Sequence, residues 1–171
     1  QRWVLADEMR LGLHGQVRRV WAPRGIKVRQ RRQIVYRWKY LALAVDGVRG
    51  ELAWKWLDNV KKETMVSVVA EWKQRDIVAI VWDGLGSHRA RVVREAGPAL
   101  IGLPPSAPEL NPAERVIEEI RGRIEGRVYD SLQAKCDEAE SFLKELAADP
   151  ERVRRLAGWS WIRAADESLA A

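Results

Sequence analysis

Several features that define large classes of protein are scarce or missing in this sequence. It has a single cysteine, Cys136, which excludes an internal disulfide and a metal site built from several thiolates. No run approaches 18 apolar residues, so no transmembrane helix is predicted. The N-terminus lacks the charged-then-apolar pattern of a secretory signal, and there are no repeats. We therefore expect an intracellular protein, and the start at Gln1 rather than Met leads us to expect part of a longer chain.

Basic residues are in excess, and the excess is concentrated in one segment. The 171 residues, enough for one domain, carry 30 Lys and Arg against 24 Asp and Glu, a net charge of +6. Such a balance favours a polyanionic partner, most simply nucleic acid, although a merely basic soluble protein is the alternative. Residues 17–39 contain no acid, and Pro23 and Gly25 predict a turn there between two strands. A block of one sign more often meets phosphate than forms a solvated hairpin, so we expect these nine side chains to bind DNA: Arg18, Arg19, Arg24, Lys27, Arg29, Arg31, Arg32, Arg37 and Lys39.

Two short apolar runs each end on a carboxylate. Residues 77–82 are apolar and mostly β-branched, bounded by Asp76 before and by glycines after, which predicts a strand buried on both faces and ending at Asp83. Residues 3–6 form a similar run that ends at Asp7. Ligands gather at the carboxyl ends of parallel strands, so both acids are candidates for a site.

The order of the elements predicts the fold class. Residues 1–57 are patterned as an antiparallel meander with strands at 34–45 and 51–57. A helix at 61–75, the strand at 77–82, a helix at 87–95 and a strand at 99–103 follow, and a proline-rich connector leads to helices at 111–127 and 130–147 and a last short helix from Asp149 to Gly158. This order predicts an α/β, ribonuclease H-like (retroviral integrase-like) mixed sheet with helices on both faces and a helical C-terminal extension over residues 131–171. In such a sheet the first strand and the strand at 77–82 are adjacent, so Asp7 and Asp83 become neighbours.

Neighbouring carboxylates repel one another, and a shared divalent cation removes that cost. The oxygen ligands suit Mg²⁺ or Mn²⁺. Glu114, in the first turn of the helix after the connector, is the best third ligand. The alternative for Glu114 is a capping box with Asn111 as N-cap and Pro112 at the first helical position, and the helix taken alone favours it. For Asp7 and Asp83 the alternative is a turn-forming acid. All three acids together favour a metal site.

Four segments carry a resemblance to a known family: ADEMR at 6–10, VWAPRG at 20–25, VWDGLGSHRA at 81–90 and LPPSAPELNPAERVIEEIR at 103–121. The sequence resembles the DDE transposases of the mariner-like superfamily, in their bacterial insertion-sequence branch. The last segment is the most specific, since this family has a proline-rich connector into an Asn-Pro-x-Glu helix. Thirty residues stand between Asp83 and Glu114, close to the family's spacing. Two positions depart from the pattern: Gly84 stands where Asn is common, and Ser106 where an aromatic is common.

The resemblance implies a function for the whole of residues 1–171. It implies a DDE catalytic domain in which Asp7, Asp83 and Glu114 bind two Mg²⁺ or Mn²⁺ ions, cleave DNA and transfer the 3′-end to a target, at TA dinucleotides. The N-terminal helix-turn-helix domains of the family are absent from this sequence. The expected partners are transposon ends and target DNA, with a homodimer on DNA, in the bacterial cytoplasm and at the nucleoid when DNA is bound.

Further residues and rival functions stay open at this point. His88 is a candidate contact to the scissile phosphate or a metal-bound water, with capping or packing as the alternative. Glu118, one helical turn after Glu114, is a lower-ranked ligand because it lies next to Arg121. Glu8 is discounted because it points to the face of its strand opposite Asp7. The rival functions are a domesticated DNA-binding module that no longer cuts, and another ribonuclease H-like nuclease such as a resolvase.

Overall fold

A five-stranded mixed sheet forms the centre of the molecule. The computed structural model describes residues 2–15, 21–29, 31, 33–104 and 107–170. The strand order is β3-β2-β1-β4-β5; β1 pairs antiparallel with β2, β2 pairs antiparallel with β3, and β1-β4 and β4-β5 are parallel. The mixed sheet and the pairing of the first strand with the strand at 77–82 are as predicted. The strands are β1 (Arg2–Gly12), β2 (Trp38–Asp46), β3 (Glu51–Leu57), β4 (Ile77–Trp82) and β5 (Ala99–Gly102).

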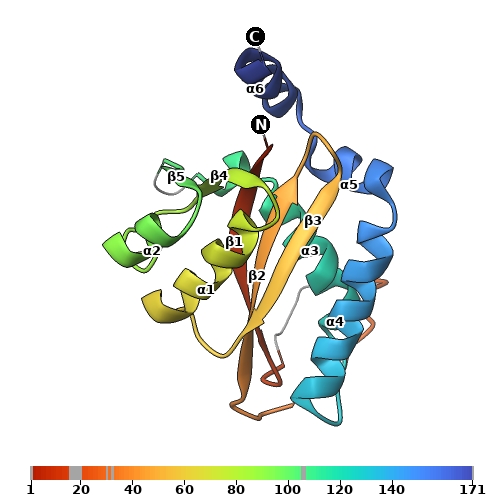
Figure 1. Cartoon of the computed structure of the whole chain (residues 1–171). Coiled ribbons are helices and arrows are strands. Elements are labelled where there is room, and N and C mark those ends of the chain that lie inside the picture. Colours follow the sequence, from red (N-terminus) through yellow and green to blue (C-terminus); the bar gives the residue numbers. More distant parts are fainter. Residues whose placement is uncertain (1, 16–20, 30, 32, 105–106, 171) are drawn as a thin grey trace.

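Helices cover both faces of this sheet (Figure 1). On one face α1 (Lys62–Lys73) and α2 (Arg91–Ala96) pack on a core that includes Val4, Ala6 and Trp82. On the other face α3 (Ala113–Ile124), α4 (Leu132–Ala147) and α5 (Pro150–Ala157) pack on a core that includes Met9 and Leu11. Residues of β1 therefore alternate between the two cores, as the two-residue period of a strand requires. None of the described helices has the length and apolar character needed to cross a membrane.

Several element boundaries differ from the predicted ones. The first strand does not end at residue 6: it continues through Asp7 to Gly12, because residues 7–12 pair with β2 in register from Asp7↔Leu43 to Gly12↔Trp38. The second strand begins at Trp38 rather than at residue 34. Residues 87–90 form turns, and α2 begins only at Arg91.

The C-terminal part contains one helix that the sequence pattern did not predict. The last predicted helix is confirmed as α5: Asp149 Oδ1 accepts the backbone N–H of Arg152 at 3.0 Å, Pro150 follows, and Gly158 ends the helix. After it comes α6 (Ser160–Ala170), which Figure 1 shows beside the N-terminal end of β1. Ile162 of α6 is buried against Trp3 and Leu5, which lie near the opposite end of the sequence.

Candidate active site

The two strand acids are brought level at the centre of the sheet. The parallel pairing of β1 and β4 includes Leu5↔Val81, and the same register carried two residues further sets Asp7 level with Asp83. Asp83 directly follows the last residue of β4, whereas Asp7 lies inside β1. The predicted adjacency of the two strands is therefore confirmed, and the description of Asp7 as a strand-end residue is wrong.

Glu114 reaches the same centre from the start of α3. Its carboxyl group lies beside that of Asp7 and raises the pKa of Asp7. Asn111 seats the start of the helix: its side-chain Nδ2 donates to the carbonyl oxygen of Ala6 at 3.0 Å, and its Oδ1 accepts the N–H of Ala113 at 3.2 Å. Asn111 is 4% exposed, so this contact is enclosed and ties the helix start to the residue beside Asp7.

The capping box considered for this helix does not form in the structure. The N-cap is Pro112, without a side-chain cap, and Asn111 lies one residue before it. Glu114 is directed to Asp7, and the amide of Asn111 is engaged with the preceding strand. The physical reason is that Asn111 Oδ1 accepts the N–H of Ala113, while the N–H of Glu114 donates to the backbone oxygen of Asn111 and the Glu114 carboxyl group faces Asp7.

The Asp7 carboxyl group is held in a setting that resists ionisation. Burial raises its pKa, the negative charge of Glu114 and the hydrogen bond with Glu114 raise it further, and the backbone N–H of Glu8, which donates to Oδ1 at 2.7 Å, lowers it only in part. The resulting pKa is about 8. A hard divalent cation placed beside this carboxyl group would favour its charged form, so the setting of Asp7 is a good fit for such an ion.

Asp83 contacts His88, and His88 in turn contacts Glu8, which lies on the face of β1 opposite Asp7. His88 Nδ1 lies 2.8 Å from Asp83 Oδ1, and His88 Nε2 lies 3.2 Å from Glu8 Oε1. Neither Nε2 nor Oε1 has a hydrogen bond of good geometry in the described part of the chain, so the 3.2 Å contact is electrostatic. Burial lowers the pKa of His88, but the contact with Glu8 and the charges of Glu8 and Asp83 outweigh it and raise that pKa.

The structure therefore gathers the candidates into two groups. Asp7 meets Glu114, while Asp83 meets Glu8 and His88, whose ligand atoms all lie within 4.8 Å of one another. Among the residues that the structure describes, the predicted trio of Asp7, Asp83 and Glu114 does not form such a group. The role of that trio stays a prediction.

Glu8 is the residue that reasoning from the sequence set aside. The prediction that it faces away from Asp7 is correct, because it contacts His88, which stacks on Trp82 in the core under α1. The error was to treat that face as remote from the site, since the chain after β4 turns Asp83 toward it. Part of this arrangement is visible in the sequence. Trp82 directly precedes Asp83 and His88 follows it by five residues, so a turn between them brings the two rings near Asp83.

Gly84, where the resembling family commonly has Asn, leaves space that another side chain fills. A Cβ at this position would lie 2.5 Å from the guanidinium Nη2 of Arg89. The guanidinium group of Arg89 therefore occupies the space beside Gly84 that the carboxamide of Asn would take in the family. Glu118, the lower-ranked acid, pairs with Arg121 at 2.6 Å and is 47% exposed, as expected of a surface acid.

The basic segment leaves the sheet as an exposed extension of β1 and β2. Backbone bonds from Leu13 to Arg37 and from Gly15 to Gln33 hold its base. The turn at Pro23 and Gly25 is confirmed by the bond from Ile26 N to the Pro23 oxygen and by the positive φ of Gly25. The predicted strands on either side are wrong over residues 21–29 and 33–37, which adopt no regular structure.

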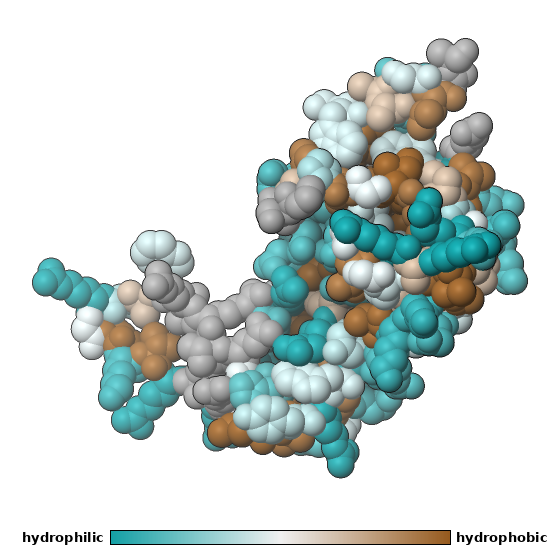
Figure 2. All heavy atoms as spheres, turned by 90° about the vertical axis from the view of Figure 1, so that its left-hand side faces the viewer, coloured by the Kyte–Doolittle hydropathy of each residue, from teal (hydrophilic) through white to brown (hydrophobic). Residues whose placement is uncertain are grey.

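Most of the predicted DNA-binding side chains point into solvent. Arg24, Lys27, Arg29, Arg31 and Arg37 are exposed, whereas Lys39 lies in β2 and pairs with Asp58 at 2.7 Å. The remaining three, Arg18, Arg19 and Arg32, lie outside the described residues. Figure 2 shows a projection from the body where hydrophilic and hydrophobic side chains lie together, and residues 21–37 have this mixture, with Trp21, Ile26 and Ile34 exposed.

The chain that carries these acids has a match among known families. Residues 2–134 match the model of the DDE superfamily endonucleases. The chain belongs to this family. Curated protein sequences contain no significant match to the chain. This membership agrees with the resemblance to DDE transposases drawn from the sequence motifs.

Solved structures with a similar fold include several of Mos1 transposase. The Mos1 paired-end complex with Mg is 18% identical, with a TM-score of 0.69, over 92% of this chain and 51% of that one. The Mos1 strand transfer complex is 16% identical, with a TM-score of 0.68, over 92% and 50%. The catalytic domain of Mos1 mariner transposase is 16% identical, with a TM-score of 0.58, over 92% and 76%. The chain of this DDE superfamily endonuclease thus has the transposase catalytic fold and spans about half the length of the complete Mos1 chains.

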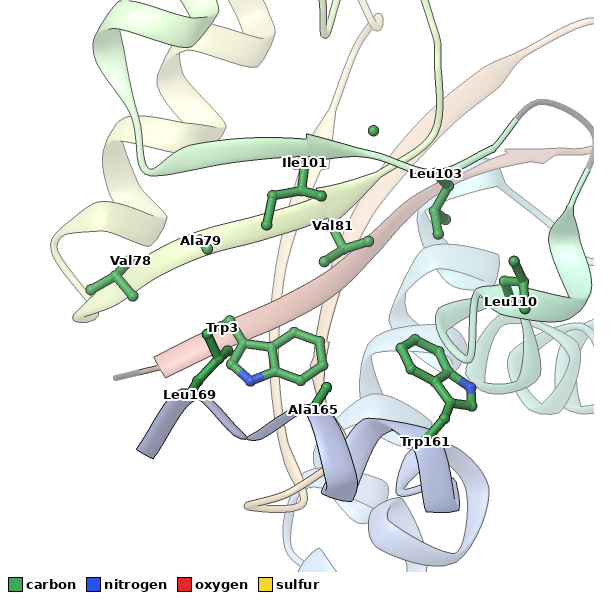
Figure 3. A pocket seen from close by; sticks show the side chains of 11 residues that line it. Trp3, Val78, Ala79, Val81, Ile101, Leu103, Leu110, Trp161, Ala165 and Leu169 are labelled. Carbon is green, nitrogen blue, oxygen red and sulfur yellow. The ribbon is translucent and has the colours of Figure 1, made fainter. Parts of the chain in front are cut away.

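A separate cavity of about 460 Å³ lies between the sheet edge and α6 (Figure 3). Its labelled side chains, among them Val81, Ile101 and Trp161, are apolar and point toward one another. Trp3 at its rim donates from Nε1 to Asp166 at 2.9 Å, which fixes α6 against β1. An apolar lining provides no metal ligands, so this cavity is not a candidate for the phosphoryl chemistry.

Proposed function

We propose that this DDE superfamily endonuclease is the catalytic domain of a transposase, which cleaves DNA and transfers the resulting strand with a divalent metal. The observation that carries the proposal is the half-buried pairing of Asp7 with Glu114 at the centre of the sheet, level with Asp83. Two like charges side by side and partly shielded from water are costly, so the pairing is accounted for by a cation. Family membership supports the same chemistry.

The proposed ligands of the metal are Asp7, Asp83 and Glu114. When bound, two such ions supply activation of the attacking water or DNA 3′-hydroxyl and stabilise charge on the leaving oxygen. The protein's own residues do the positioning: β1 holds Asp7 rigidly between two strands, Asn111 fixes the start of the helix that carries Glu114, and the exposed arginines bind the DNA backbone without reading its sequence.

The finer parts of the proposal rest on the resemblance and on the similar structures. Solved Mos1 structures are described as a paired-end complex with Mg, another with Mn, and a strand transfer complex. These descriptions support Mg²⁺ or Mn²⁺ as the cofactor and DNA ends and a target as the partners. Membership of the bacterial insertion-sequence branch, insertion at TA, a two-ion mechanism, a dimer on DNA and a nucleoid location belong to the proposal as well.

A DNA-binding module that no longer cuts is the main rival function. Such a module requires the exposed arginines but has no use for Asp7 and Glu114, whose burial together costs free energy without a cation. A resolvase would use the same fold and metal, and the joining of a DNA 3′-end to a target distinguishes a transposase from it.

Changing Glu114 to Gln tests the metal site. We expect Glu114→Gln to unfold at a temperature no lower than that of the parent, because Glu114 forms no helix cap and its charge repels that of Asp7. We expect it to lose Mn²⁺-dependent cleavage of supercoiled DNA by on the order of 10²-fold or more, since it removes one ligand charge. The matched control is Glu145→Gln on α4, an exposed acid that pairs only weakly with Arg123 at 3.9 Å. If Glu114→Gln cleaves at the parent rate and Glu118→Gln does not, the third metal ligand is Glu118, one turn further along α3, and not Glu114.

Charge reversal tests the exposed extension. We expect the double change Arg29→Glu and Arg31→Glu to weaken DNA binding at moderate salt and to reduce the slope of log Kd against log salt by about 1 to 2, since each lost phosphate contact removes about 0.9 from the slope. Arg155→Glu, an exposed arginine of α5, is the matched control. The measurement is fluorescence anisotropy across a salt series, and an unchanged slope in the double variant removes these side chains from the interface.

A further inference from the structure

Glu8 and His88 have no role in the proposed reaction, yet they form a chain of contacts that ends at Asp83. The imidazole of His88 has Nδ1 at 2.8 Å from Asp83 Oδ1 and Nε2 at 3.2 Å from Glu8 Oε1. One ring nitrogen is therefore directed at a carboxylate on each side. The ring links an acid inside β1 to the acid that follows β4, across the two central strands.

The inner part of this chain is buried and its outer end is half exposed. His88 stacks on Trp82, with ring centroids 3.8 Å apart, and Trp82 packs against Trp72 of α1 at 5.7 Å. The His88 side chain is 3% exposed and that of Glu8 is 9% exposed, whereas that of Asp83 is 52% exposed. Buried rings in a packed core have one arrangement, so the half-exposed carboxylate is the member whose orientation must be set by its neighbours.

The contacts to Asp83 fall on one of its two oxygens. Oδ1 meets His88 Nδ1 and also accepts the backbone N–H of Leu85 at 3.1 Å. A carboxylate held by one oxygen offers the other, Oδ2, to a cation in a fixed direction. Partners behind a metal ligand commonly set its orientation and change metal affinity by about 10- to 100-fold when they are removed.

We propose that Glu8 and His88 are positioning residues that hold the Asp83 carboxylate in its metal-binding orientation. This inference rests on the proposed role of Asp83 as a metal ligand. Glu8 on β1 contacts Nε2 of the His88 ring, and Trp82 stacks on the face of that ring. Nδ1 of the ring then sets the orientation of the Asp83 carboxylate. The alternative is that Glu8, Asp83 and His88 hold an ion themselves, since their ligand atoms lie within 4.8 Å of one another.

Three variants test the inference. His88→Phe keeps a ring on Trp82 and removes both nitrogens, Glu8→Ala removes the anchor, and Glu8→Gln keeps a side chain of the same size with a polar oxygen facing Nε2. We expect His88→Phe and Glu8→Ala to bind Mn²⁺ about 10- to 100-fold more weakly by electron paramagnetic resonance titration. Glu8→Gln should recover part of the affinity, because it keeps the size and polarity of the anchor and loses only its charge. Cleavage by the weakened variants should return as the Mn²⁺ concentration is raised, which a general structural defect does not allow.

Asp83→Asn in the same titration separates this inference from the function beneath it. Parent-like Mn²⁺ binding by Asp83→Asn contradicts the metal-ligand role of Asp83 itself. Weak binding by Asp83→Asn with parent-like binding by both His88→Phe and Glu8→Ala contradicts only the positioning role. A loss in those two variants as complete as in Asp83→Asn, not restored by more Mn²⁺, makes Glu8 and His88 ligands and overturns the inference. If Glu8→Ala does not fold, His88→Phe decides alone.

Discussion

Asp83→Asn is expected to fold like the parent and to lose metal-dependent DNA cleavage by on the order of 10³-fold or more. Metal catalysis stabilises the transition state by several kcal/mol, and each step of about 1.4 kcal/mol is about tenfold in rate. The fold is expected to persist because the Asp83 side chain is half exposed and Asn keeps an oxygen for the N–H of Leu85. The measurement is nicking of supercoiled DNA with Mg²⁺ or Mn²⁺, paired with a thermal unfolding curve.

The matched control for this change is Asp137→Asn, an exposed acid of α4 whose side chain bonds to Gln133, away from the site. It should cut at the parent rate. Cutting by Asp83→Asn at the parent rate, with the control also unchanged, would mean that the second acid of the proposed site is not Asp83.

Asp7→Asn is expected to stabilise the protein when metal is absent and pH is high. The pKa of Asp7 is raised from its ordinary 3.8 to about 8 by burial and by Glu114. At a pH well below 3.8 the carboxyl group is protonated in both the folded and the unfolded state, so it costs nothing. Between these two pKa values the folded state binds more protons than the unfolded state, and the free energy of unfolding falls as pH rises. Above about pH 8 the full cost is present, and each tenfold difference in proton affinity between the two states corresponds to about 1.4 kcal/mol.

The measurement is urea unfolding of parent and Asp7→Asn in EDTA between about pH 5 and pH 9. The parent should lose stability relative to the variant across this range, by roughly a few kcal/mol in total, and the difference between the two curves isolates Asp7 from the other titrating groups. Added Mn²⁺ should restore the parent more at about pH 8 than at about pH 6 and should leave the variant little changed, because binding to the folded state adds stability. Parallel curves for the two proteins would show that Asp7 is not held protonated in the folded state.

Patterns confined to one stretch of chain determined much of the molecule. The strand β4 follows from its six apolar residues between Asp76 and Asp83, and its bounds agree with the prediction. Its predicted burial on both faces is only partly correct, because Val78 is exposed and Val81 is half-buried beside the cavity under α6. Helix α1 buries Met65 and Trp72 on one stripe, and α5 begins at an Asp cap followed by proline. These signals act within a few residues of the chain, so the sequence alone contains them.

The arrangement of the site depended on contacts between distant segments. The sequence named Asp7, Asp83 and Glu114 as candidates, but only the fold directed Glu114 to Asp7 through the bond of Asn111 to Ala6, 105 positions away. The length of β1 was decided in the same way. Its polar residues 7, 8 and 10 interrupt the apolar pattern, and pairing with β2 extends the strand through them.

The contact of Glu8 with His88 belongs to this second class. Strand alternation correctly set Glu8 on the face opposite Asp7, yet alternation carries no information about where the turn after β4 places His88. Helix α6 likewise exists against Trp3 and Leu5, which lie at the other end of the chain. Sequence patterns indicate which conformation each segment prefers. Which side chains from distant segments come into contact depends on how the strands pair and how the helices pack on the sheet.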